Sequence, residues 1–423
     1  MTCYNELKLR DYQIDLSDKA TQLLKDYKFV LLSMEVRTGK TMTALEAIKK
    51  FWVKKVLFLT KKKAVSSIEK DYTFFKDFFD LHVTNYESLH KVTDNDFDLI
   101  ILDESHQLGT FPKPNNKHKD IKKRFGKLPM ILLSGTISPE SYSQLFHQFF
   151  TSSYWPWSKY KNFYNWANDF VKIGIVYTSY WQSKDYSNAN YDKIMQEMHH
   201  LILTYTQKEA WFTTEVEEKV LYVTMKPIVY DLVKRLQKDK VVEGKDEIIL
   251  ADTMVKEKQK CHQLFSWTIK FESGNTKIID DTKALFIKER FKKNKIGIFY
   301  NFKAERELLK QVYWENITED LDEFNATDKN IMLQIVSGRE GISLKEADFL
   351  VYYNISFSAL SYWQSRDRLT TIDRKKNTIY WIFTKGWLES QIYEAVMKKK
   401  SFTTKMYKKW HQKENSKQRS LNT

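Results

Sequence analysis

Short apolar runs recur along the chain and are separated by longer amphipathic stretches. The first four runs are FVLL (29–32), VLFL (56–59), LIIL (99–102) and MILL (130–133). A second group comprises IGIF (296–299), IMLQIV (331–336), FLVYY (349–353) and TIYWIF (378–383). Continuous apolar runs between helical patterns are typical of buried parallel strands in βαβ units. The two groups therefore predict an α/β protein with two lobes, each a parallel sheet flanked by helices.

The segment between the two groups, residues 151–220, is rich in Tyr and Trp and lacks apolar alternation. We interpret it as helices and loops that cover one lobe or bridge the two. Its aromatic side chains either stack on bases or, more commonly for such a segment, pack in a core. The predicted organisation is a lobe at 1–150, a helical connecting segment at 151–220, a lobe at 221–400 and a basic tail at 401–423.

Length and charge narrow the class of protein. A chain of 423 residues suggests two or three domains. Its 69 Lys and Arg residues exceed its 54 Asp and Glu residues, so the net charge is +15. This balance favours a polyanionic partner, nucleic acid first, although crowded surface lysines would produce the same number. The basic loop at 111–127 and the tail either add non-specific affinity or are solvated charge runs.

Cysteine usage and hydropathy bear on the compartment. The two cysteines, Cys3 and Cys261, are too few for a disulfide framework or a cysteine zinc site. The N-terminus has no apolar signal core, and no apolar run approaches the roughly 18 residues of a membrane span. We therefore expect a cytoplasmic protein with no membrane partner, in a bacterial host cell if the chain is phage-encoded.

The segment MEVRTGKT (34–41) ends like a nucleotide-binding phosphate loop but begins differently. The strict pattern G-x-x-x-x-G-K-[ST] has a glycine where Met34 stands. A preceding apolar strand, the permissive Gly39 and a following amphipathic helix supply what phosphate binding needs. We predict that Lys40 reaches the β/γ-phosphates and that the Thr41 hydroxyl binds Mg²⁺. The alternative is a chance GKT in front of a helix.

Two adjacent acids follow another apolar strand, in DFDLIILDESHQ (96–107). Asp103 and Glu104 would lie at the C-terminal edge of a parallel sheet, where ligands bind in open α/β folds. We predict that Asp103 holds the Mg²⁺ hydration shell and that Glu104 orients and deprotonates the attacking water. The alternative is an ordinary turn with acids at a strand end.

Six segments of the predicted first lobe, including the two just described, resemble in their order the motifs of superfamily 2 DEAD/DEAH-like helicases and translocases. The resemblance is closest to a minimal Swi/Snf-like, phage-type DNA helicase, and it implies RecA-like lobes. In that superfamily the first glycine of the phosphate loop is commonly replaced. A separate motif, which lies on the N-terminal side of the loop and which LRDYQ resembles, binds the adenine base. The first-lobe motifs are LRDYQ (9–13), MEVRTGKT, VLFLTKKK (56–63), VTNYESL (83–89), DESH (103–106) and ILLSGTISP (131–139).

The second lobe supplies three further motifs, of which the last departs from the family pattern. They are KIGIFYNFKAERELL (295–309), residues 326–354 and SYWQSRDRLTTIDRKK (361–376). The family pattern Q-x-x-x-R-x-x-R is met by Gln364 and Arg368, but Thr371 stands at its last position. We expect Arg368 to act on the γ-phosphate, with Arg374 the second arginine, ahead of Arg366. The alternative for Arg366 and Arg374 is an exposed helix face.

The motifs and the resemblance together give four sets of site residues. The catalytic set is Lys40, Asp103, Glu104, Arg368 and Arg374. The nucleotide set is Gln13, Arg37, Thr38, Gly39, Lys40, Thr41 and Gly341, with Thr41 and Asp103 on the metal. Nucleic-acid backbone contacts are Thr60, Lys61, Thr84, Asn85, Asn301, Phe302 and Ser337. Residues that couple the two sites are His106, Ser134, Thr136 and Gln364.

The resemblance implies an ATP-dependent DNA helicase or duplex-DNA translocase that uses ATP and Mg²⁺. Its partner would be single-stranded, duplex or forked DNA, together with proteins of phage-type replication or recombination. Two alternatives stay open: an RNA-dependent ATPase or helicase, and a motor-fold adaptor that clamps DNA or a protein with little catalysis. The intact GKT and DESH argue against the adaptor, and the Swi/Snf-like features favour duplex DNA over RNA.

Overall fold

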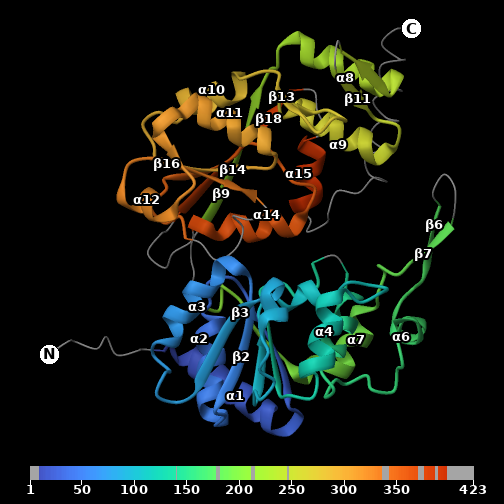
Figure 1. Ribbon diagram of the computed structural model, residues 1–423, viewed down its shortest axis with the longest axis vertical. Coiled ribbons are helices and arrows are strands. Elements are labelled where there is room, and N and C mark those ends of the chain that lie inside the picture. The colour runs from blue at the N-terminus through green and yellow to red at the C-terminus, as the bar shows by residue number, and fades with distance from the viewer. Residues whose placement is uncertain are drawn as a thin grey trace. The chain divides into compact units, whose positions relative to one another are not determined.

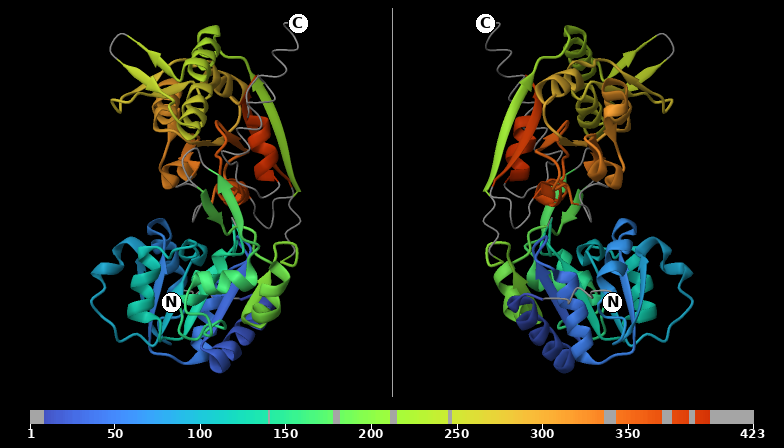
Figure 2. Two further views of the ribbon diagram at one scale, coloured as in Figure 1. Left: turned by 90° about the vertical axis from the view of Figure 1, so that its right-hand side faces the viewer. Right: turned by 90° about the vertical axis from the view of Figure 1, so that its left-hand side faces the viewer.

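The computed structural model divides the chain into two units, Met1–Phe212 and Thr213–Thr423. It describes residues 9–139, 141–177, 182–210, 215–244, 247–335, 343–369, 376–385 and 389–397. Each unit contains one six-stranded sheet flanked by helices (Figures 1 and 2). The predicted two-lobed α/β fold is confirmed.

The sheet of the first unit has the order β3-β2-β4-β5-β1-β8, and all its neighbouring strands are parallel. Its strands are β1 (Phe29–Met34), β2 (Lys55–Thr60), β3 (Asp80–Asn85), β4 (Leu99–Leu102), β5 (Met130–Ser134) and β8 (Ile202–Tyr205). Because every strand is parallel, the ends of β1, β4 and β5 meet at one edge of the sheet. The loops that carry the predicted nucleotide residues follow these strands.

The helices of this unit form two layers. Alternate residues of β1 face opposite cores: Phe29 and Leu31 contribute to one, Val30 and Leu32 to the other. One core includes α1 (Asp11–Tyr27), α2 (Lys40–Phe51) and α3 (Val65–Tyr72). The other includes α4 (Asn116–Phe125), α5 (Gln144–Phe150), α6 (Phe163–Phe170) and α7 (Tyr191–Met198). The central strands are thus buried on both faces, which explains their continuous apolar runs.

The aromatic segment after α5 is part of the second of these cores. Trp157 and Trp166 are fully buried, and their rings lie 5.2 Å apart. A short antiparallel pair, β6 (Gly174–Tyr177) and β7 (Gln182–Asp185), interrupts the segment before β8 returns to the sheet. The described aromatic residues of this segment therefore pack on the first unit, and the boundary between the units follows Phe212, near the end of the predicted connecting segment 151–220.

The sheet of the second unit has the order β15-β16-β14-β17-β18-β9 and is also parallel throughout. Its strands are β9 (Glu215–Val223), β14 (Ile296–Tyr300), β15 (Ile317–Thr318), β16 (Asn330–Gln334), β17 (Phe349–Tyr352) and β18 (Lys376–Thr384). Two small antiparallel pairs stand apart from it: β10 (Val241–Glu243) with β11 (Ile248–Leu250), and β12 (Thr268–Lys270) with β13 (Thr276–Ile278).

The helices of the second unit surround one hydrophobic core. They are α8 (Pro227–Asp239), α9 (Met254–Phe265), α10 (Thr282–Arg290), α11 (Lys303–Tyr313), α12 (Leu321–Ala326), α14 (Ala359–Arg366) and α15 (Glu389–Met397). No helix within the described ranges is long and apolar enough to cross a membrane. The predicted basic tail at 401–423 lies outside the described residues.

Candidate functional site

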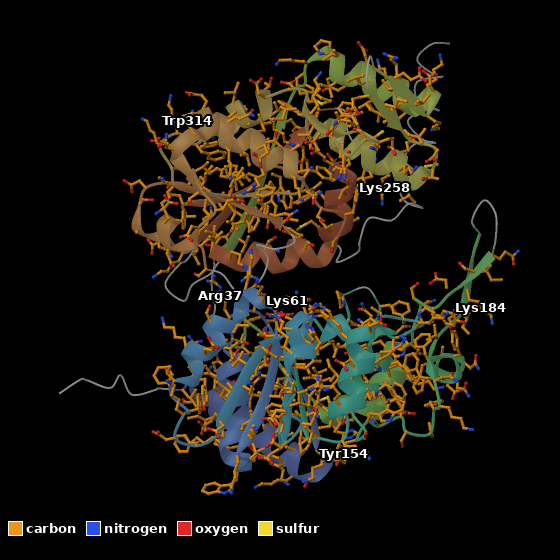
Figure 3. The ribbon with its side chains drawn as sticks, in the orientation of Figure 1. Arg37, Lys61, Tyr154, Lys184, Lys258 and Trp314 are labelled. Carbon is orange, nitrogen blue, oxygen red and sulfur yellow. The ribbon has the colours of Figure 1, made fainter. Side chains whose placement is uncertain are left out.

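The phosphate loop runs from the end of β1 to the start of α2. Met34 is the last residue of β1 and is fully buried. The backbone turns through left-handed conformations at Arg37, with φ 68°, and at Gly39, with φ 80°. A Cβ atom on Gly39 would lie 2.1 Å from Nε2 of Gln13, so a larger residue there would displace the Gln13 amide and would also strain the backbone at this φ. Arg37 adopts the same backbone region at a cost of roughly 1–2 kcal/mol. Figure 3 shows Arg37 with Lys61 at one edge of the first unit.

Helix α1 holds the loop from one side. The Tyr12 hydroxyl donates a hydrogen bond to the Thr38 carbonyl at 2.9 Å. The Gln13 side-chain amide donates to the Gly39 carbonyl at 3.4 Å. Gln13 was predicted to read adenine, and the structure places its buried amide beside the loop that would hold the phosphates. Its adenine contact stays a prediction.

The segment after β8 holds the loop from the other side. The Glu35 N–H donates to the Tyr205 carbonyl at 2.9 Å, and the Gln207 N–H donates to Oε2 of Glu35 at 2.7 Å. The Gln207 side-chain amide donates to the Val36 carbonyl at 2.9 Å. The rings of Tyr12 and Tyr205 stack at 4.2 Å with an interplanar angle of 16°, which joins the two sides.

Sequence reasoning missed Glu35, Tyr205 and Gln207. Some 170 residues of chain separate Glu35 from Gln207, so no local spacing indicates the contact. Tyr12 was not predicted either, but it did have a sequence signal, because it lies beside Gln13 in the motif LRDYQ.

The predicted acids lie where β4 ends. Asp103 is 8% exposed, and its Oδ2 accepts a hydrogen bond from the Thr60 hydroxyl at 2.7 Å. Burial, and then the negative charge of Glu104, raise the pKa of Asp103 to about 6. The Tyr86 hydroxyl donates to the Asp103 carbonyl at 2.6 Å, which fixes the strand end. A buried carboxylate with a raised pKa gains from a cation, as a Mg²⁺ ligand should.

The lysine of the loop meets the acids. Lys40 Nζ lies 3.9 Å from Oε1 of Glu104. The same amine would lie 3.6 Å from a Cβ atom on Gly135, so it also lies beside the loop after β5. The structure therefore brings together three loops that the sequence singled out separately. Thr41 is the second residue of α2, and its role as an oxygen ligand of Mg²⁺ stays a prediction.

Three of the four predicted coupling residues, His106, Ser134 and Thr136, form one network. Nδ1 of His106 lies 3.3 Å from Oε2 of Glu104 and 3.2 Å from the Ser134 hydroxyl. The Ser134 hydroxyl in turn donates to the Thr136 carbonyl at 2.8 Å. His106 and Ser134 are buried, so a movement of the Glu104 side chain would displace the closely packed His106 ring. The coupling role that the family resemblance implies for these residues stays a prediction.

The predicted nucleic-acid contacts of this unit differ in exposure. Thr60 is buried and its hydroxyl is bonded to Asp103, so it belongs to the acid's surroundings and not to a surface. Asn85 accepts a hydrogen bond from the Ser88 N–H at 2.9 Å and thereby begins a short helical turn. Lys61 and Thr84 are half-buried. Their contacts with nucleic acid stay predictions.

In the second unit, a buried carboxylate fixes the turn after β14. The backbone N–H groups of Asn301 and Phe302 donate to Oε2 of Glu305 at 2.6 and 2.9 Å. Oε1 of Glu305 accepts from the Asn354 side chain at 2.7 Å, and Asn354 contacts Nε2 of His262 at 2.7 Å. Glu305, Asn354 and His262 are all buried. The turn that carries two predicted contacts is therefore rigid within this unit.

The two described arginines near α14 have different surroundings. NH1 of Arg366 lies 3.6 Å from Oε1 of Glu218. The Glu218 carboxylate also accepts hydrogen bonds from Tyr362 at Oε1 and from Trp381 and Tyr393 at Oε2. Arg366 is thus tied to a buried network on the sheet. Arg368 is buried, and its carbonyl accepts from the Leu344 N–H at 2.9 Å.

The remaining predicted residues cannot be placed. Ser337, Gly341 and Arg374 lie outside the described residues, as does the side chain of Gln364. Among the residues that are described, no group of three or more His, Cys, Asp and Glu side chains forms a metal cluster. A Mg²⁺ ion needs no such cluster here, because it is usually held by one or two protein oxygens, substrate phosphates and water.

Comparison with known protein families gives one match, to the N-terminal part of the chain. Residues 6–80 match the family described as Type III restriction enzyme, res subunit. This match covers α1, the phosphate loop and the elements up to the start of β3. No curated protein is significantly similar in sequence to the chain.

Two solved structures are similar to the chain over most of its length. The Sulfolobus solfataricus SWI2/SNF2 ATPase core domain is 15% identical with a TM-score of 0.41, over 94% of this chain and 90% of that one. The Pyrococcus furiosus Hef helicase domain is 14% identical with a TM-score of 0.47, over 91% of this chain and 97% of that one.

Proposed function

We propose that this superfamily 2 helicase-like chain is a nucleic-acid-dependent ATPase that couples ATP hydrolysis to movement along DNA. The observation that carries the proposal is the convergence of Lys40, Glu104 and Asp103 at the edge of the first sheet, 3.9 Å separating Lys40 Nζ from Glu104 Oε1. A lysine, two strand-end acids and a helix N-terminus form the set that phosphoryl transfer to water requires.

Each residue has a distinct part in the proposed reaction. The Lys40 amine and the N–H groups at the start of α2 bind the β- and γ-phosphates. Thr41 and Asp103 supply oxygen ligands to Mg²⁺, which neutralises charge on the phosphates when bound. Glu104 orients the attacking water and accepts its proton. His106 contacts both Glu104 and Ser134, so a movement of Glu104 in this step would be transmitted through His106 to Ser134. Arg368 supplies a guanidinium for the charge that develops on the γ-phosphoryl group.

Movement along DNA is the finer part of the proposal. Lys61, Thr84 and Asn85 in the first unit and Asn301 and Phe302 in the second would contact the backbone without reading sequence. Closure of the units on ATP and their opening after hydrolysis would advance one of them along a strand. Phage-type replication or recombination is the process we propose for it, on the family resemblance alone.

One experiment tests the proposal. ATP turnover is measured with no nucleic acid, single-stranded DNA, duplex DNA, forked DNA and RNA, with Lys40→Ala as the inactive control. We expect stimulation by DNA and loss of turnover in Lys40→Ala. Stimulation by RNA alone would refute the DNA assignment, and turnover that no nucleic acid stimulates would favour the adaptor.

A further inference from the structure

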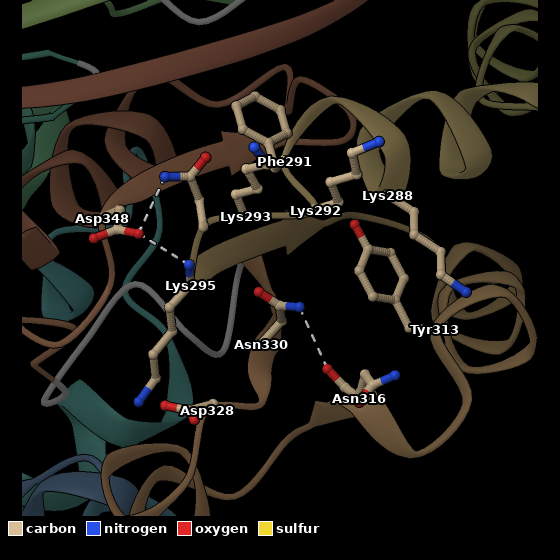
Figure 4. Close-up of a pocket in the computed structure, with 11 residues that line it drawn as sticks. Lys288, Phe291, Lys292, Lys293, Lys295, Tyr313, Asn316, Asp328, Asn330 and Asp348 are labelled. Carbon is tan, nitrogen blue, oxygen red and sulfur yellow. Dashed lines mark hydrogen bonds between the residues drawn. The ribbon is translucent and has the colours of Figure 1, made fainter.

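A basic groove lies at the edge of the second sheet where its strands begin. The groove has a volume of about 540 Å³ (Figure 4). It is lined by Lys288, Phe291, Lys292, Lys293, Asn294, Lys295, Tyr313, Asn316, Asp328, Asn330 and Asp348. Four lysines and two aspartates leave this lining with a positive charge.

The groove is separate from the predicted nucleic-acid contacts of the same unit. Lys295 immediately precedes β14, whereas Asn301 and Phe302 immediately follow it. Five residues of strand at about 3.3 Å each place the two edges roughly 17 Å apart. A ligand in the groove would therefore not occupy the turn that carries Asn301.

Two of the charged side chains hold the groove together. Lys295 Nζ donates to the carbonyls of Phe324 and Thr327, both at 2.6 Å. Asp348 accepts from the Lys295 N–H at 3.0 Å and from the Asn294 side chain at 3.3 Å. These contacts fix the base of the groove, so its shape does not depend on a ligand.

Three lysines along the rim can turn to a ligand. Lys293 makes no hydrogen bond or ion pair with any other residue that the structure describes. Lys292 pairs with Glu289, but both side chains are more than half exposed, so the pair contributes little. Lys288 donates to the Val312 carbonyl at 2.6 Å from an exposed position. Exchanging such contacts for phosphate oxygens costs little.

An exposed tryptophan adjoins the groove. Trp314 follows the lining residue Tyr313, stands two residues before the lining residue Asn316, and is 76% exposed. Its backbone has φ 53° and ψ −126°, which is an outlier for a bulky residue. Strained residues of this kind cluster at ligand-binding sites, and an exposed indole leaves a large apolar face in water.

We propose that the lysine rim and Trp314 form an accessory site for single-stranded nucleic acid, an inference that rests on the proposed function. A single strand repeats a phosphate and a flat base, and this edge offers separate amines and one exposed ring. Amines neutralise phosphates, and aromatic rings stack on bases without regard to sequence. A compact anion would leave the indole unused. The site would hold a strand that extends beyond the main contacts.

The test compares the full chain with three variants. These are Trp314→Ala, the double variant Lys292→Glu with Lys293→Glu, and Trp52→Ala as a matched control. Trp52 also ends a helix at positive φ, 65°, and is 87% exposed, but it lies in the first unit. Affinity is measured by fluorescence anisotropy for single-stranded DNA of about 8 and about 40 nucleotides, at several salt concentrations. Thermal unfolding and DNA-independent ATP turnover are recorded for each variant and should match the wild type.

We expect Trp314→Ala to weaken binding of the long strand at least about fivefold and to leave the short strand unaffected. The double charge reversal should lower the salt slope for the long strand by about 1.4, since two phosphate contacts are lost. Variants that bind the long strand like Trp52→Ala, with an unchanged salt slope, would overturn the inference and favour a protein partner. A wild type that binds neither strand would overturn the inference alone, because the proposed function also admits duplex DNA, and it is ATP turnover that no DNA stimulates that would refute the proposed function.

Discussion

The bonds between the phosphate loop and the segment after β8 make a quantitative prediction about ATP binding. Glu35→Ala removes the carboxylate that accepts the Gln207 N–H at 2.7 Å. A hydrogen bond to a charged group contributes about 1.5–3 kcal/mol, and the half-exposed position of Glu35 reduces this to about 1–2 kcal/mol. If the loop must keep this shape to hold phosphate, affinity for ATP should fall about 5- to 30-fold.

Two further variants separate geometry from charge. Glu35→Gln keeps an oxygen that can accept the same N–H, so we expect less than about a fivefold loss. Gln207→Ala keeps the backbone bond but loses the 2.9 Å contact with the Val36 carbonyl, worth about 0.5–1.5 kcal/mol, or about 2- to 12-fold in affinity. Equilibrium titration with a fluorescent ATP analogue measures each value, with thermal unfolding recorded in parallel. Wild-type affinity in a folded Glu35→Ala protein would refute the reasoning, as would an equal loss in Glu35→Gln.

Three other predictions concern single side chains. Arg37→Gly should leave thermal stability nearly unchanged, because relief of about 1 kcal/mol of backbone strain offsets the similar conformational entropy that glycine loses on folding. The KM for ATP should rise at least about fivefold, and an unchanged KM would place the Arg37 side chain outside the site. Arg368→Ala should lower ATP turnover of the folded protein by about 10³-fold or more, whereas Arg366→Ala should mainly destabilise the fold; similar turnover in both would contradict this assignment. Burial lowers the pKa of His118 to about 3 and that of His147 to about 4, so both stay neutral in the fold while the unfolded chain binds protons below pH ~6.5. The free energy of unfolding should therefore fall as the pH drops below that value, by up to about 1.4 kcal/mol per histidine per pH unit. Urea unfolding at pH 7 and pH 5 would measure the change, and equal unfolding free energies at the two pH values would contradict the prediction.

The apolar pattern predicted the strands that are buried on both faces and missed those at the edges. All eight apolar runs lie in or overlap strands of the two sheets. The edge strands β3 and β9 are only partly buried: DLHVTN of β3 carries no continuous apolar run, and in EVEEKVLYV of β9 the run VLYV follows five residues of which four are charged. The short β8, ILTY, is also an edge strand and was read as part of the connecting segment. This explains why the predicted first lobe ended near residue 150, although β8 brings the chain back to its sheet.

Within the candidate site, the sequence predicted residues that lie in local motifs and missed those that reach across the fold. Lys40, Asp103 and Glu104 follow strands and meet because parallel strands end at one edge. Thr60 is the last residue of β2, and its buried hydrogen bond to Asp103 differs from the surface role predicted for it. A sequence pattern gives the end of a strand but not the direction of each side chain beyond it. Gln207 has no motif at all, because its role arises from the return of β8 to the sheet.

The replaced glycine of the phosphate loop has a structural reason. A glycine is required only where the backbone takes a left-handed turn or another group comes close. Met34 does neither, since it continues β1 and pairs with Tyr205 of β8. The left-handed turns fall later, at Arg37 and Gly39, and the latter also touches Gln13. The flexibility that a first glycine would allow is replaced here by hydrogen bonds from α1 and from the segment after β8. A loop held in this way is already formed before a phosphate arrives, so less of the binding free energy is spent on ordering it.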